Sequence, residues 1–405
     1  MSSGEETVSR FRILALDLLF MAINFSALTL FSSLKDVISA DYGFSSSELE
    51  WAAIAYSMGI FFAFLIGHSR FFEERPKITV LFAGLCAAIP QLLIPLIPNA
   101  LAVAALRFLQ GLVMSAVPIF SYQGGKFFPG FRTLAVGTIL SGIFIGGLVG
   151  STAGPYLSVL TGWRATYVVF GALMIAVAIA WIYLIPNAAL PTVRREVKKV
   201  SLKVWRQRFT WVWGFTFFPG LWIVFTLAPL IHFIAEKQLG IQGHIASTAL
   251  EGSYITWSFI VGVLARYLCK GATARRGIFR GIATAQIIQY VLTVAGAAVA
   301  LVTRNPTVFL ASLFIVAAIQ GTGPTFWSIP TVAYPEEVAS RAGYALGLIS
   351  NSAALIGPAV TLIISALAVT GTWVVVMALS AFGAAITLAS LKLRLPAEEV
   401  GGREG

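Results

Sequence analysis

Charged residues are scarce in this chain of 405 residues. Asp, Glu, Lys and Arg make up only 11% of it, whereas 58% is hydrophobic and the mean hydropathy is +0.86. A soluble globular domain carries about 25% charged residues and is about half apolar. The composition therefore excludes a soluble domain of any size and places the chain among integral membrane proteins.

Reactive side chains are scarce as well. The two cysteines, Cys86 and Cys269, lie in or beside apolar runs and give no disulfide framework. Three histidines leave little with which to build a metal site, and the sequence contains no P-loop and no nucleophile elbow. We therefore expect neither an enzyme nor an ATP-driven pump, and we expect no metal or other cofactor.

Long uncharged apolar runs are abundant instead. A run of about 20 apolar residues is long enough to cross a bilayer as a helix. The sequence predicts an all-α integral membrane protein with twelve transmembrane helices, at residues 13–33, 51–68, 78–97, 100–122, 133–158, 165–186, 211–235, 252–269, 279–302, 307–333, 342–367 and 371–391.

Positive residues gather on one side of these spans. With the N-terminus placed inside, four of the 28 Lys and Arg residues lie in outer segments, Arg107 lies deep within a span, and the other 23 lie in inner segments or at the inner ends of spans. Cytoplasmic loops carry an excess of Lys and Arg, so we predict a multi-pass protein of the cell membrane with both termini cytoplasmic. The same bias accounts for the net charge of +11, and its scatter over short loops argues against a nucleic-acid partner.

The chain divides into two similar halves. A basic segment, 187–210, separates an N-terminal half (1–186) from a C-terminal half (211–405), each with six spans. Both halves repeat the order Gln-Gly, Arg, Gly, Trp at intervals of 22, 15 and 16 residues in the first and 21, 16 and 16 in the second. These positions are Gln110, Arg132, Gly147 and Trp163, and then Gln320, Arg341, Gly357 and Trp373. The match indicates two six-helix halves of common ancestry.

Several local motifs, together with this plan, resemble the major facilitator superfamily over essentially the whole chain. "RFLQG" (107–111) is similar to the family's fourth-helix pattern, and "GSTAGPYLSV" (150–159) to its fifth-helix pattern. The loop "GHSRFFEERPK" (67–77) departs from the family signature because it lacks the expected Asp, so the subfamily stays open. The resemblance implies a secondary transporter that rocks its halves around a site near the membrane midplane.

Two ionisable residues lie inside the first half. At 1.5 Å per residue, Arg107 lies roughly 10 Å below the outer boundary and Asp17 about 6 Å above the inner one, which leaves an axial gap of about 14 Å. Buried charges are functional candidates by default. We interpret Arg107 as a group that binds an anion or modulates a nearby proton site, with Asn24 at similar depth and Gln110 one turn away; the alternative is a structural role. Asp17 is a proton-coupling candidate, unless its carboxylate reaches the membrane interface.

Polar or aromatic residues at the midplane of the second half complete the predicted substrate site. They are Trp222, Thr226, Gln320 and Asn351. The Pro219-Gly220 pair before Trp222 permits a break in the helix at mid-depth.

Glycines collect in the fifth span, where four of them recur every fourth residue. Small residues let helix backbones approach closely in lipid. The stripe is either a static packing seam or a surface that slides against a helix of the other half, and Pro155 is expected to loosen the outer end of this helix. The stripe consists of Gly142, Gly146, Gly150 and Gly154, and Gly357 and Pro358 form a similar step in the second half.

Three functions remain open. We favour transport of a small organic or inorganic anion, coupled to protons, by a monomer. The first alternative is a proton-coupled exporter of drugs or hydrophobic cations, although no midplane carboxylate is present to meet a cation. The second alternative is a sensor or assembly partner on the same scaffold that does not transport.

Overall fold

The computed structural model describes residues 3–191, 204–366 and 369–401, and within these ranges it contains helices and no strands. Contacts between residues group the chain into two units. Unit 1 comprises residues 1–123 and 139–192, and unit 2 comprises residues 124–138 and 193–405.

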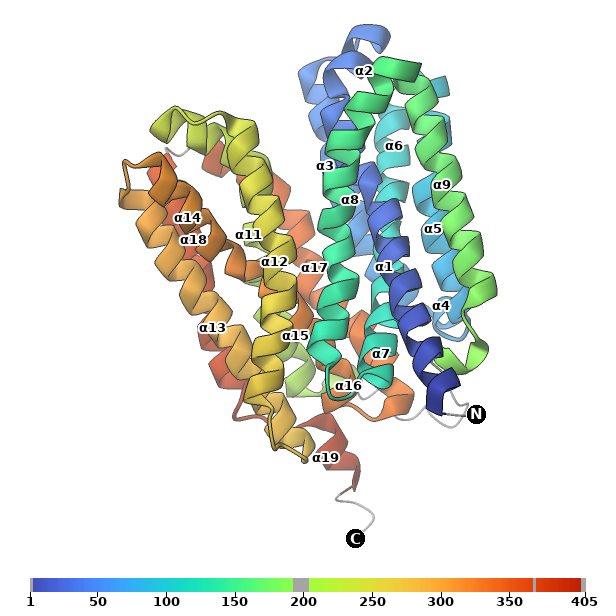
Figure 1. Ribbon diagram of the computed structural model, residues 1–405, viewed down its shortest axis with the longest axis vertical. Coiled ribbons are helices and arrows are strands. Elements are labelled where there is room, and N and C mark those ends of the chain that lie inside the picture. The colour runs from blue at the N-terminus through green and yellow to red at the C-terminus, as the bar shows by residue number, and fades with distance from the viewer. Residues whose placement is uncertain (1–2, 192–203, 367–368, 402–405) are drawn as a thin grey trace. The chain divides into compact units, whose positions relative to one another are not determined.

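The helices of unit 1 run side by side (Figure 1). Within it, α3 packs against α6, α5 packs against α9, and α1 contacts both α5 and α9. The elements are α1 (Ser3–Ser33), α2 (Lys35–Tyr42), α3 (Ser46–Gly67), α4 (Arg70–Glu73), α5 (Pro76–Leu93), η1 (Ile94–Leu96), α6 (Ala100–Gly111), η2 (Leu112–Ala116), α7 (Val117–Phe127), α8 (Arg132–Thr161), α9 (Trp163–Leu184) and η3 (Asn187–Ala189). The last residues of α7 and the first turns of α8 group with unit 2.

Unit 2 is built mainly around α11, which packs against α12, α17 and α18, and α13, which packs against α12, α14 and α18. Its elements are η5 (Val204–Arg206), α11 (Arg208–Leu239), α12 (Gly243–Leu268), α13 (Arg275–Val302), α14 (Pro306–Val316), η6 (Ala317–Gly321), α15 (Thr322–Ser328), α16 (Pro330–Ala333), α17 (Glu336–Ala366), α18 (Val369–Ser390) and α19 (Pro396–Gly401).

The predicted spans correspond to these helices. Within the described residues, eleven helices are long and apolar enough to cross a membrane. The remaining predicted span, 342–367, falls on the 31-residue helix α17, apart from its last residue, which lies outside the described part. The fold is therefore the all-helical membrane fold that the sequence predicts.

The sequence led us to expect single α-helices in the fourth and tenth spans, and the structure differs from this prediction. Each contains a five-residue 3-10 segment next to a Gln-Gly pair. The segment η2 begins directly after Gln110-Gly111, and η6 ends with Gln320-Gly321. A proline follows each segment closely, Pro118 and Pro324, and it cannot donate a backbone hydrogen bond into the preceding turn. The helix tightens locally as a result.

Local signals explain where several helices begin. Ser45 and Glu48 form a capping box at the start of α3, in which Glu48 N donates to Ser45 Oγ and Ser45 N donates to Glu48 Oε2. Asn99 caps α6 and Asn305 caps α14, the fourth and tenth spans. The repeated asparagine cap supports the internal repeat.

The glycine stripe of α8 faces α1 in the same unit. A Cβ atom at Gly146 would lie 2.2 Å from the Ala22 carbonyl oxygen, and one at Gly150 would lie 2.3 Å from that of Ser26. Added Cβ atoms at Gly142 and Gly154 would also meet α1. Thr29 Oγ1 donates to the Gly147 carbonyl at 2.6 Å across the same seam. The contacts therefore match a packing seam within one half, because the residues that face the stripe belong to α1 of the same unit.

Proline does not interrupt two helices where the sequence suggested a weakness. The helix α8 continues through Pro155 to Thr161, and α11 continues through Pro219 and Gly220 to Leu239. Gly357 is buried, and a Cβ added there would lie 3.7 Å from Phe225 Cβ, an ordinary van der Waals contact. The side chain of Pro358 lies outside the described part.

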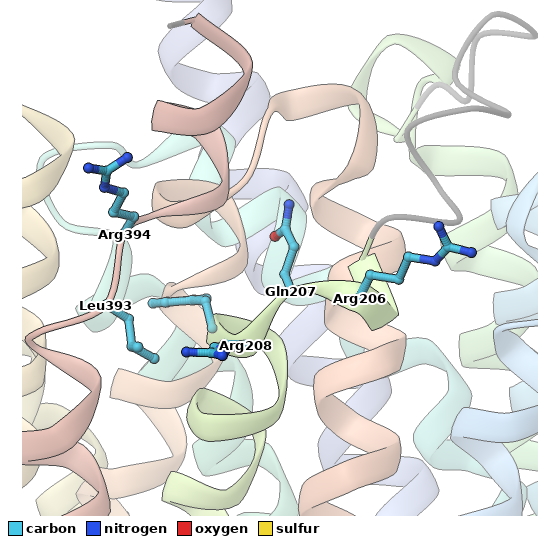
Figure 2. Close-up of a pocket in the computed structure, with 6 residues that line it drawn as sticks. Arg206, Gln207, Arg208, Leu393 and Arg394 are labelled. Carbon is cyan, nitrogen blue, oxygen red and sulfur yellow. The ribbon is translucent and has the colours of Figure 1, made fainter.

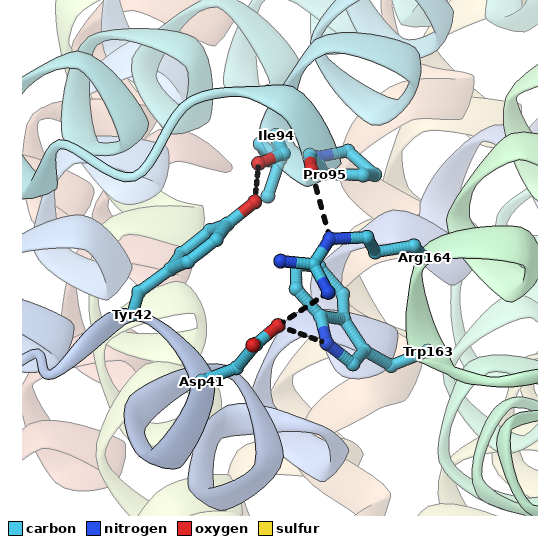
Figure 3. Close-up of polar contacts among 6 residues, drawn as sticks. All are labelled: Asp41, Tyr42, Ile94, Pro95, Trp163 and Arg164. Carbon is cyan, nitrogen blue, oxygen red and sulfur yellow. Dashed lines mark hydrogen bonds and ion pairs between the residues drawn. The ribbon is translucent and has the colours of Figure 1, made fainter.

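A polar cluster, which we call the α2 clasp, joins three connections of unit 1 (Figure 3). It consists of Asp41, Tyr42, Trp163 and Arg164, with the carbonyl groups of residues 94 and 95. Asp41 Oδ2 accepts from Trp163 Nε1 at 2.8 Å and lies 2.6 Å from Arg164 Nη1. Arg164 Nε and the Tyr42 hydroxyl donate to the two carbonyl groups, at 3.2 and 3.1 Å.

In unit 2, the segment 124–138 packs against the connection before α17. Lys126 Nζ lies 3.0 Å from Glu336 Oε1, and a Cβ at Gly125 would meet Thr331. These contacts join residues that are distant in the sequence, because 124–138 belongs to the N-terminal half of the sequence repeat.

Candidate functional site

Arg107 on α6 is 1% exposed and is held mainly by carbonyl groups of α1. Its Nη1 donates to the Ala27 carbonyl at 2.8 Å and to Gln110 Oε1 at 2.7 Å, and its Nη2 donates to the Leu28 carbonyl at 3.4 Å. The contact with Gln110 is the one expected from the i+3 spacing on a helix. Nη1 is therefore fully used, whereas the bond from Nη2 is long.

Two aromatic rings cover the faces of the same guanidinium group. Its Cζ lies 4.6 Å from the ring centroid of Phe31 and 4.7 Å from that of Tyr56. Such contacts attract a cation to the ring quadrupole. Arg107 Nε makes no hydrogen bond, and no carboxylate among the described residues pairs with this arginine. The edge of the guanidinium group formed by Nε and Nη2 therefore has the fewest hydrogen bonds, although the group is buried and permanently charged.

A chain of amides extends from Arg107 into α5. Gln110 Nε2 donates to Gln91 Oε1 at 2.8 Å, and Gln91 Nε2 is buried without a partner. Sequence reasoning missed Gln91, although a lone Gln in the apolar run 78–97 was a visible signal, because only polar residues of the expected cavity helices were considered.

Asn24 does not bond to Arg107. Its side chain is fully buried, Nδ2 donates to the Phe20 carbonyl of its own helix at 2.9 Å, and Oδ1 has no partner. Arg107 instead contacts carbonyl groups three and four residues further along α1. The two residues therefore approach the same stretch of α1 without forming a shared bond.

Asp17 is fully buried. Its Oδ1 accepts from Trp181 Nε1 at 2.8 Å, and its Oδ2 has no hydrogen-bond partner. The interpretation that this carboxylate reaches the membrane interface is wrong. Ten residues of helix, roughly 15 Å, separate Asp17 from Ala27, whose carbonyl group accepts from Arg107. This separation agrees with the sequence-based conclusion that Asp17 is too far from Arg107 for an ion pair.

The four candidate residues of unit 2 lie on α11, η6 and α17. Thr226 is 2% exposed and Gln320 7% exposed. Trp222 is half-buried, its ring meets Phe218 edge-on at 5.5 Å, and its Nε1 has no partner. Asn351 Nδ2 donates to the Gly347 carbonyl at 2.9 Å and leaves Oδ1 unpaired. Free donors and acceptors thus remain on Trp222 and Asn351.

A polar cluster that sequence reasoning missed surrounds the carbonyl of Thr216 on α11. The Tyr290 hydroxyl donates to this carbonyl, as does Gln286 Nε2 at 3.2 Å. Thr325 Oγ1 donates to Gln286 Oε1 at 3.2 Å. The cluster lies beside the Pro219-Gly220 step, so the expected weak point of α11 is supported by side chains of α13 and α15 and does not break.

Acidic and metal-binding side chains do not gather into a further site within the described residues. No group of three or more His, Cys, Asp or Glu side chains there could hold a metal ion.

Comparison with known proteins identifies the family. The family model for the Major Facilitator Superfamily matches residues 18–358, and no curated protein matches the sequence significantly. The fold is similar to the crystal structure of the human organic anion transporter MFSD10 (TETRAN), with 15% identity, a TM-score of 0.68, and coverage of 93% of this chain and 99% of that one. It is also similar to the proton:xylose symporter XylE, with 14% identity, a TM-score of 0.67, and coverage of 97% and 98%. The chain therefore belongs to the major facilitator superfamily, a family of membrane transporters and not of enzymes.

Proposed function

We propose that this secondary transporter moves a small organic anion across the cell membrane by alternating access and couples that movement to protons. The observation that carries the proposal is Arg107, a buried arginine whose Nε and Nη2 edge keeps unused donor capacity. A carboxylate or phosphate pairs with this edge of a guanidinium group through two parallel hydrogen bonds.

The energetics favour an anion at this position. A charge inside a membrane costs about 2.5–3.5 kcal/mol on insertion scales, and here carbonyl groups and aromatic rings meet that cost without a carboxylate. A bound anion would supply the missing opposite charge. A carboxylate or phosphate attracts the guanidinium cation more strongly than a neutral carbonyl does, so the anion would displace the long bond from Nη2 to the Leu28 carbonyl. Anion binding would then release a contact between α6 and α1.

Asp17 is our candidate for the proton-coupling group. It is a buried carboxylate with one unsatisfied oxygen, Oδ2, to which a proton can be added without breaking the bond from Trp181 to Oδ1. One structural neighbour is described as a proton symporter and another as an organic anion transporter, which agrees with the proposal at the level of fold alone.

The orientation is part of the same proposal. The excess of Lys and Arg at one side supports cytoplasmic termini. We further propose a monomer, with small-molecule solutes and protons as its ligands and the lipid bilayer as its surroundings.

Counterflow in proteoliposomes tests the substrate class. Vesicles are preloaded with one member of a panel of monocarboxylates, organic phosphates, neutral sugars and lipophilic cations, and uptake of the labelled compound is measured. We expect exchange of one or more anions and none of the cations. Exchange of lipophilic cations alone would identify an exporter of drugs or hydrophobic cations, and no exchange of any solute would favour a sensor.

A further inference from the structure

A cavity of about 360 Å³ opens at the end of unit 2 where α11 begins and α18 has ended (Figure 2). It is unrelated to the residues around Arg107. Half of its lining side chains are arginines: the lining consists of Arg206, Gln207, Arg208, Phe209, Leu393 and Arg394.

The three arginines carry positive charge without a paired acidic side chain among the described residues. All three are exposed, and within the described part of the chain none of them forms an ion pair. Glu398 follows on α19, but it lies 3.8 Å from Arg276 and accepts from the Leu395 amide at 3.0 Å. The cavity is therefore electropositive.

The start of α11 adds to this charge. Its N-cap residue, Gln207, makes no capping hydrogen bond, so no side chain caps the first turn of this 32-residue helix. The N-terminal end of a helix carries a partial positive charge and attracts anions. Figure 2 shows Gln207 with Arg206 on one side and Arg394 on the other, so the uncapped start of α11 lies among the arginines.

Two tryptophans place the cavity at a definite depth. Trp211 is 46% exposed, and its Nε1 donates to the Trp205 carbonyl at 2.8 Å. Their ring centroids are 5.6 Å apart. Exposed tryptophans of membrane proteins concentrate at the level of the lipid headgroups. Arg206 and Arg208 lie between these two tryptophans in the sequence and therefore at the same level.

We propose that this arginine pocket binds the phosphate of an anionic phospholipid headgroup. Phosphate is the group that arginine recognises best, through two parallel hydrogen bonds. Phe209 and Leu393 supply an apolar side against which the glycerol and first acyl carbons can lie. The inference rests on the proposed orientation, because the leaflet that faces the cytoplasm is the one rich in anionic lipids.

Native mass spectrometry of the purified full-length protein tests the proposal. Phosphatidylglycerol or phosphatidylcholine is titrated into the detergent solution, and retained lipid is counted. We expect saturable retention of phosphatidylglycerol in preference to phosphatidylcholine. In the variant Arg206→Gln, Arg208→Gln, Arg394→Gln we expect the affinity to fall roughly fivefold for each charge removed.

A matched variant controls for net charge. Arg12, Lys270 and Arg280 are exposed residues of the same predicted side that lie outside the pocket, and their replacement by Gln removes the same charge. We expect less than a twofold change in phosphatidylglycerol affinity. An equal loss in both variants would overturn the proposal, as would equal retention of the two lipids by the unmodified protein.

Soluble anions distinguish the source of the phosphate. Inorganic phosphate and pyrophosphate at millimolar concentration should not displace phosphatidylglycerol, and full displacement would overturn the lipid as the ligand. The single variant Arg394→Gln, on the connection after α18, provides a milder test should the triple variant fail to fold. The assay requires no transported solute, so its outcome is independent of the counterflow test.

Discussion

At Arg107 the charge and the shape of the side chain make separate contributions. The rings of Phe31 and Tyr56 contact the flat guanidinium group, and the carbonyl groups of Ala27 and Leu28 accept from its two terminal nitrogens. Lysine retains the charge but has a compact ammonium group without a planar fork. The two properties can therefore be separated by substitution.

The first prediction follows from that separation. Arg107→Lys should raise the half-saturating concentration of the transported anion by about tenfold or more, the loss of one strong hydrogen bond. Arg107→Gln should abolish binding. Calorimetric binding and the melting temperature are measured together, with the exposed Arg304→Gln as a control that should change neither.

Unchanged affinity of Arg107→Gln for the transported anion would require us to abandon the anion hypothesis. A lower melting temperature with normal binding would assign Arg107 a structural role only.

Asp17 allows a second prediction at this scale. Asn has the same shape and can still accept from Trp181, but it cannot exchange a proton at Oδ2. Asp17→Asn should therefore retain counterflow and lose accumulation driven by a pH gradient. The control is Asp36→Asn, which removes an exposed carboxylate of α2 and should leave both activities intact. Accumulation at the normal level in Asp17→Asn would exclude this residue from coupling.

Among the elements, the seam between α1 and α8 leaves almost no space between two helix backbones. Gly146 has no room for a Cβ, because the Ala22 carbonyl of α1 would lie 2.2 Å away, whereas Gly147 has ordinary space at 3.7 Å from Thr29. Backbone atoms cannot move aside as a flexible side chain can. A larger residue at Gly146 must therefore push the two helices apart.

The third prediction concerns this seam. Gly146→Leu should destabilise the protein by about 1–3 kcal/mol through overpacking and should stop transport. Gly147→Ala, one position along, should transport and melt normally. Thermal unfolding and counterflow provide the two measurements. Wild-type behaviour of Gly146→Leu would show that the helices do not need this close approach.

The elements also show how far sequence reasoning reaches. The apolar runs predicted all the long helices, because lipid leaves a backbone no other way to satisfy its hydrogen bonds. Their ends were less accurate: α12 begins at Gly243 and not at 252, because a run of apolar residues stops at Glu251 although the helix does not. The bond from Arg107 to Gln110 followed from spacing, but the enclosure by Phe31 and Tyr56 depends on packing between helices, which local spacing does not encode.

For the whole molecule, the division into units matters most. The segment 124–138 precedes the basic connection in the sequence but packs with unit 2. Its Lys126 meets Glu336, and a Cβ built at Gly125 would lie 2.8 Å from Thr331 Cβ. If the halves of the sequence repeat rock against each other during transport, these contacts must open and close.

The fourth prediction uses that proximity. A disulfide needs its Cβ atoms about 3.5–4.5 Å apart, which a small relaxation between residues 125 and 331 provides. The pair Gly125→Cys and Thr331→Cys, with Cys86 and Cys269 replaced by Ser, should crosslink on oxidation. Transport should stop and should return on reduction.

The single cysteine variants, treated in the same way, serve as controls and should transport before and after oxidation. Full transport by a completely crosslinked protein would show that these segments stay together throughout the cycle and would contradict alternating access at this end.

The α2 clasp has a practical consequence. Connections between spans are the usual places to insert an epitope or a fluorescent label, because exposed loop tips tolerate extra residues. The connection that contains α2 is an exception, since Asp41 is tied to Trp163 and Arg164 while Tyr42 is tied to the chain at residue 94. A tag inserted there would break these hydrogen bonds and the ion pair together. Labels are therefore better placed in connections whose side chains make no contacts with other connections.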